Sequence, residues 1–135
     1  MSAPLARLMR SSIVHVAFAF IAMGSWAIFA NRAHPMPAPL IAGLIQGTLS
    51  AGITLVLKRG IEELARRFSG LTALLAPPAI AGLVSASVLT IIHTLGGTPE
   101  IGRTIAVPLT VATSYAALYN FSLWRSRKAM NHGAG

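Results

Sequence analysis

The chain has 135 residues, of which 54% are hydrophobic and only 10% are charged. Soluble domains carry about a quarter charged residues, so this composition excludes an ordinary soluble domain, which could not cover its surface with so few charges. The chain also contains no cysteine, which excludes disulfides, thiol chemistry and cysteine-based metal sites.

Four apolar stretches follow one another along the chain, at residues 13–30, 38–57, 71–95 and 101–124. A helix that crosses the hydrocarbon core needs roughly 20 mostly apolar residues, and each stretch comes within range of that length. We therefore predict an all-α membrane protein that forms one domain over residues 1–135. Short connections make neighbours antiparallel, so the four spans pair into two hairpins.

The second stretch contains three small residues spaced four apart, Gly43, Gly47 and Ala51. Residues at this spacing share one helix face and let another backbone approach closely. We therefore predict a helix-packing face here. The partner is either another span of the same chain or a second copy.

Residues 59–68, between the second and third stretches, have the pattern of a short amphipathic helix. Ile61, Leu64 and Phe68 recur at spacings of three and four and make one apolar face. The ordinary interpretation is a linker helix that lies on the cytoplasmic membrane surface. The functional interpretation is a docking face formed by these three residues.

Prolines interrupt the third and fourth stretches, at Pro77, Pro78 and Pro108. A proline lacks a backbone N–H and clashes with the preceding turn, so each predicts a kink or a helix start. The carbonyls that lose their donors must then bond to neighbouring side chains or to water. After the fourth stretch, residues 125–135 predict a short, flexible, basic tail.

The basic residues alternate between the two sides of these spans. Nine of the eleven Lys and Arg residues precede the first span or follow the second and fourth, and two lie in the other connections. The positive-inside rule then places both termini in the cytoplasm, in an inner membrane whose anionic lipids contact these charges. This placement accounts for the net charge of +8, and no nucleic acid is expected as a partner.

Acidic residues are almost absent, and the chain has no aspartate. Glu62, Glu63 and Glu100 are the only carboxylates, and all three lie in connections between spans. A proton-coupled transporter with a membrane-embedded carboxylate is therefore disfavoured. Paired-carboxylate and Ser-His-Asp catalysis lack their residues, and the four histidines are scattered over both sides. We expect no catalytic residue, cofactor or metal, and hence no enzyme.

Uncharged polar residues remain inside the spans. Such side chains usually form hydrogen bonds between helices. The functional interpretation is a polar cleft between the two hairpins, whose candidate residues are Gln46, Ser50, His93, Tyr115 and Asn120.

The end of the fourth stretch, residues 119–125, reads Tyr-Asn-Phe-Ser-Leu-Trp-Arg. With four short spans in so small a chain, this segment resembles the Asn/aromatic/basic span ends of GtrA-like proteins. The corresponding end of the second stretch, residues 53–59, lacks the Asn and the aromatic residues. The resemblance implies movement of polyprenyl-phosphate-linked sugars across the inner membrane.

Two functional expectations follow. The first is a non-catalytic inner-membrane protein that translocates or handles a lipid-linked or small substrate, as an oligomer. The alternative is an accessory or scaffolding subunit that packs against a larger membrane complex.

Overall fold

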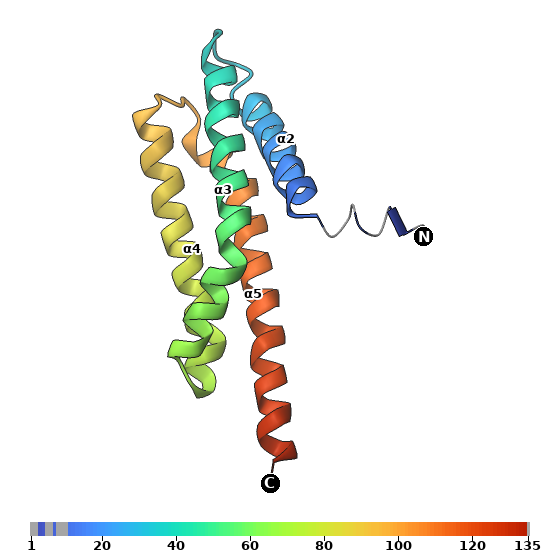
Figure 1. Ribbon diagram of the computed structural model, residues 1–135. Helices are drawn as coiled ribbons and strands as arrows, with labels where there is room; N and C mark the ends of the chain where they lie inside the picture. Colours follow the sequence, from blue (N-terminus) through green and yellow to red (C-terminus); the bar gives the residue numbers. More distant parts are fainter. Residues whose placement is uncertain (1–2, 5–6, 8–10, 135) are drawn as a thin grey trace.

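The computed structural model describes residues 3–4, 7 and 11–134, and its long helices confirm the all-α class (Figure 1). The helices are α2 (Ser12–Ala30), α3 (Ala38–Arg67), α4 (Gly70–Leu95) and α5 (Ile101–Gly133). Three of them, α2, α3 and α4, are long and apolar enough to cross a membrane. Arg10 and Gly135, which belong to the predicted basic segments, lie outside the described residues.

The helices pack as two antiparallel hairpins, α2 with α3 and α4 with α5. Helices α3 and α5 each contact all three of the others, whereas α2 and α4 share no contact within the described chain. The α3–α5 pair therefore forms the centre of the bundle, with α2 and α4 on either side of it (Figure 1).

Two predicted boundaries are wrong. The amphipathic segment 59–68 is not a separate helix, because α3 runs without a break to Arg67. The basic tail is not a separate irregular segment, because α5 continues to Gly133. Both segments consist largely of good helix formers without proline, so nothing local ends the preceding helix.

Small residues hold α2 against α3. A Cβ atom at Gly43 would lie 3.0 Å from the carbonyl oxygen of Gly24, and one at Gly47 would lie 2.9 Å from that of Phe20. Only a glycine permits such a close backbone approach. The predicted packing face is thus used within the chain, with α2 as its partner at both glycines.

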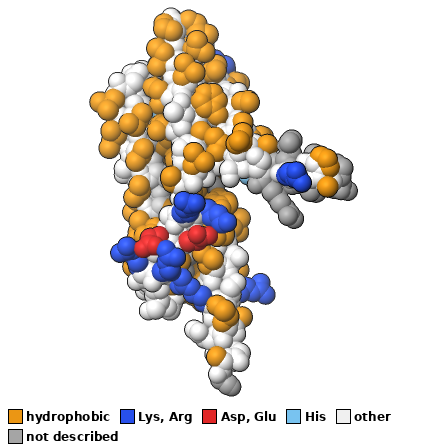
Figure 2. Space-filling view, viewed as in Figure 1, with side chains coloured by type: hydrophobic (Ala, Val, Ile, Leu, Met, Phe, Trp, Pro, Cys, Tyr) orange, Lys and Arg blue, Asp and Glu red, His pale blue; other side chains and the backbone are white. Residues whose placement is uncertain are grey.

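Charge and apolar surface are segregated along the bundle. Figure 2 shows Lys and Arg side chains, with acidic side chains among them, in a band below a largely apolar surface. We call this the basic end; its residues are Lys58, Arg59, Arg66, Arg67, Arg125, Arg127 and Lys128. Away from it, large apolar side chains such as Phe18 and Leu83 are about 70% exposed, at 69% and 71%. This pattern fits contact with lipid.

The glycine contacts predict the effect of a larger side chain on the α2–α3 seam. Gly47→Leu should destabilise the protein by about 1–3 kcal/mol, as overpacking usually does, because the backbone of Phe20 cannot yield. Gly52→Leu is the matched control, since a Cβ there meets nothing within 4 Å. Unfolding in mixed detergent measures both, and equal stability losses would contradict the assignment of this seam.

Candidate functional site

A chain of buried hydrogen bonds joins α3 to the end of α4. Gln46 Nε2 donates to Ser50 Oγ at 2.8 Å, and Gln46 Oε1 lies 2.9 Å from His93 Nε2. The other ring nitrogen of His93, Nδ1, lies 2.7 Å from Thr98 Oγ1. Gln46 and His93 are both fully buried.

These contacts fix the role of one ring nitrogen. A glutamine oxygen only accepts, so Nε2 of His93 donates to Gln46, whereas the hydroxyl of Thr98 can donate to Nδ1 or accept from it. Both ring nitrogens of His93 thus have a hydrogen-bond partner. Gln46, Ser50 and His93, three of the five predicted cleft residues, thus come together as an interhelical clasp.

Asn120 lies at the other end of the bundle and bonds to the interrupted part of α4. Its amide nitrogen donates to the carbonyl oxygens of Ala73 and Leu74, at 2.9 Å each. In an α-helix these carbonyls would accept from residues 77 and 78, but both positions are prolines without an N–H. The predicted need for a neighbouring donor is confirmed, and Asn120 supplies it to both carbonyls.

Tyr115 does not join either group. Its side chain is 42% exposed and stacks on Tyr119, with ring centroids 5.8 Å apart. The hydroxyl of Tyr119 in turn donates to Glu62 on α3. The five residues of the predicted cleft are therefore distributed over three places, because α4 separates Ala73 from His93 by almost its whole length.

A second buried polar cluster lies between the two connections at the end opposite the basic one. The amide nitrogen of Asn31 donates to Thr104 Oγ1 at 2.7 Å, and its oxygen accepts from the N–H of Glu100 at 2.9 Å. Beside them, the Glu100 carboxylate lies 3.1 Å from His34 Nε2. Sequence reasoning missed this cluster. Its only sign in the sequence is a polar residue at the end of one span, and the sequence does not show that this residue faces the start of another span.

The predicted docking face at residues 61–68 is largely covered by the chain itself. Ile61 is fully buried, and Leu64 and Phe68 are half-buried. Helix α5 lies against this segment, where a guanidinium nitrogen of Arg127 donates to the carbonyl of Ala65. Ile61 thus packs inside the bundle, whereas Leu64 and Phe68 stay partly exposed, and docking through this face stays a prediction.

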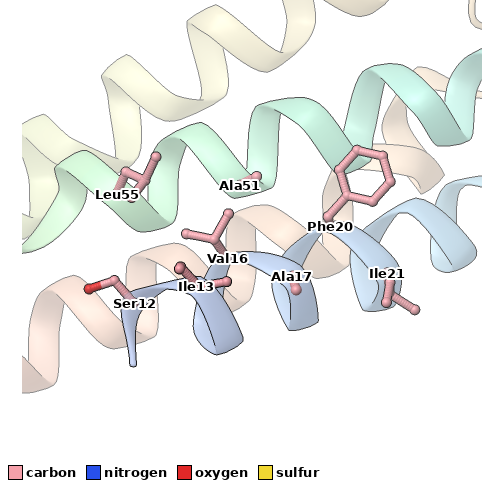
Figure 3. Close-up of a pocket in the computed structure, with 8 residues that line it drawn as sticks. All are labelled: Ser12, Ile13, Val16, Ala17, Phe20, Ile21, Ala51 and Leu55. Atoms are coloured by element: carbon pink, nitrogen blue, oxygen red, sulfur yellow. The ribbon is translucent and has the colours of Figure 1, made fainter. Parts of the chain in front are cut away.

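One hollow on the described part of the protein is an open, apolar groove between the first half of α2 and the middle of α3 (Figure 3). Its volume is about 550 Å³, within the range of about 300–1,000 Å³ found for small-ligand sites. Its walls are Ser12, Ile13, Val16, Ala17, Phe20 and Ile21 of α2 with Ala51 and Leu55 of α3.

The groove begins where the close contacts of Gly43 and Gly47 with α2, the glycine seam, end. Phe20 packs against Gly47, and its ring carbon Cδ2 lies 3.1 Å from the position of a Cβ there. One turn further along α3, Ala51 lines the groove instead of closing the seam, and Leu55 follows it. Ala51 therefore marks the point at which the predicted packing face becomes the floor of a groove.

The basic end carries one compact ion cluster. Glu63 accepts hydrogen bonds from Arg66 and Arg67, which lower the pKa of its carboxyl below the usual value. No three His, Asp or Glu side chains gather into a metal site within the described residues.

Comparison of the chain with protein-family models, with curated proteins and with solved structures finds no match. The resemblance to GtrA-like proteins stays a prediction from residues 119–125. In the structure, two of these residues donate to α4, Asn120 as described and Trp124 through Nε1 to the carbonyl of Gly70 at 3.1 Å.

The clasp predicts that its members depend on one another. Gln46→Leu should cost about 1–3 kcal/mol of stability, because the buried N–H of His93 then lacks an acceptor. The double variant Gln46→Leu/His93→Leu should cost less than the sum of the two single variants. Thr48→Ala is the control, since its hydroxyl is exposed and bonds to its own helix; strictly additive costs in detergent unfolding would argue against the clasp.

Proposed function

We propose that the chain is a non-catalytic, multi-pass protein of the inner membrane that handles a lipid-like substrate in the α2–α3 groove. The observation that carries this proposal is the combination of an open, apolar groove with polar groups that already bond to one another. Gln46 and His93 hold helices together through all of their side-chain polar atoms, so a small polar substrate at this place would have to break these bonds. An apolar chain entering the groove would break none.

The orientation in the membrane belongs to the same proposal. Helix α5 is more polar than the others, but it exposes apolar side chains such as Val111 and Leu118, at 52% and 72%. Its buried positions, Thr104, Pro108 and Ala116, face the bundle. We take α5 as the fourth span, with the basic end and both termini in the cytoplasm, as the positive-inside rule predicts.

The substrate handled in this way is either a membrane lipid or a lipid-linked molecule. The groove extends over only part of the α2–α3 seam, because Gly43 and Gly47 close the rest. Complete translocation would therefore require the seam to open or a second copy to supply the remaining path. The homo-oligomer expected from the sequence therefore stays part of the proposal, with the second copy supplying the rest of the path.

The alternative of an accessory subunit has one observation in its favour. Helix α5 extends beyond the rest of the bundle towards the C-terminus (Figure 1), and residues 128–134 are exposed. A partner at this extension would co-purify in fixed ratio with the intact chain and be lost when residues 128–135 are removed.

Lipid retention tests the main proposal. Ala51→Phe should fill the groove and reduce the lipid that co-purifies in mild detergent, measured by native mass spectrometry, by several-fold. Ala79→Phe is the matched control, because Ala79 is exposed on α4, which does not contact α2. Equal lipid retention by the two variants, or a wild-type protein without lipid, would contradict the proposal.

A further inference from the structure

We propose that the α2–α3 groove binds an anionic phospholipid, with one acyl chain between the helices and the phosphate at Arg59 and Lys58. This inference rests on the proposed lipid-handling function and adds the chemical class of the ligand. It concerns a bilayer phospholipid that the protein selects by charge.

The register of α3 places Arg59 at the mouth of the groove. Ala51 and Leu55 line it, and Arg59 is the next residue at a spacing of four, on the same helix face. It lies one turn, about 6 Å along the helix axis, beyond Leu55. Lys58, three residues after Leu55, flanks the same position.

Neither cation is neutralised by a carboxylate of the described chain. Lys58 and Glu62 have the spacing of a helical ion pair, but Glu62 accepts the hydroxyl of Tyr119 and makes no ion pair with Lys58. The other acid of this segment, Glu63, has the spacing of a helical ion pair with Arg59, but it is held by Arg66 and Arg67 and makes no ion pair with Arg59. Both Lys58 and Arg59 are exposed and are thus available to an external anion.

The length of the groove fits an acyl chain in one leaflet. From Ser12 to Phe20 it follows nine residues of α2, which are eight helical rises or about 12 Å, whereas one leaflet of hydrocarbon is about 15 Å thick. The ring of Phe20 against Gly47 closes its inner end. A chain entering from the basic end would therefore reach towards the middle of the bilayer and stop there.

A phosphate suits the mouth better than a neutral headgroup. Arginine pairs with phosphate oxygens through two parallel N–H···O bonds, and a basic residue near an anionic membrane surface favours contact by about five-fold. With the apolar groove behind it, the mouth matches both parts of a lipid such as phosphatidylglycerol.

Quenching of an engineered tryptophan tests this ligand class in vesicles of phosphatidylcholine and phosphatidylglycerol. Trp26 and Trp124 are replaced by Phe, and Ile21→Trp places the reporter in the groove wall. Bromine atoms, which quench tryptophan at short range, are carried by one lipid or the other. Brominated phosphatidylglycerol should quench with an apparent binding constant at least five-fold that of brominated phosphatidylcholine.

The preference should disappear in Lys58→Gln/Arg59→Gln and persist in the control Arg125→Gln/Lys128→Gln, which removes the same charge from α5 at the same end. A reporter at Leu83→Trp, on the lipid-exposed face of α4, should show no preference. Equal quenching by both lipids at Ile21→Trp, or equal loss in the two double variants, would overturn the inference. In that case, lipid retention that is sensitive to Ala51→Phe would still support the proposed function.

Discussion

The two carbonyls that Pro77 and Pro78 leave without donors set the central constraint on this bundle. A buried, unsatisfied carbonyl costs about 1–3 kcal/mol, and Ala73, which carries one of them, is 5% exposed. The amide group of Asn120 has two hydrogens and donates one to each carbonyl. Because this requires α5 to lie against the first turns of α4, the bond positions the central helix α5 at the basic end.

The requirement that buried polar groups find hydrogen-bond partners accounts for most of the polar residues inside the protein. Gln46 and His93 satisfy each other between α3 and α4, and Asn31 and Thr104 do so between α2 and α5. Each pair joins residues that are distant in sequence, 47 and 73 positions apart. The polar groups thereby determine which helices meet, and the apolar surface and the α2–α3 groove remain for contact with lipid.

The sequence predicts the helical class and the glycine seam well, because both depend on local patterns. Apolar runs of span length and the Gly43/Gly47 spacing are visible in one segment at a time. The separation of the five predicted cleft residues could not be predicted, since helical periodicity does not say whether His93 and Asn120 lie at the same end of a bundle. The continuity of α3 through residues 58–67 cannot be predicted from the apolar pattern, because that pattern ends where charge begins, although charge does not end a helix.

A double-mutant cycle between Asn120 and the two prolines tests the central constraint most directly. In the wild-type background, Asn120→Ala should lower the free energy of unfolding by about 2–3 kcal/mol, because the buried carbonyl of Ala73 and the partly buried carbonyl of Leu74 lose their donors. In a Pro77→Ala/Pro78→Ala background, α4 regains its own N–H groups, and the same substitution should cost less than about 1 kcal/mol. An equal cost in both backgrounds would contradict the assigned role of Asn120.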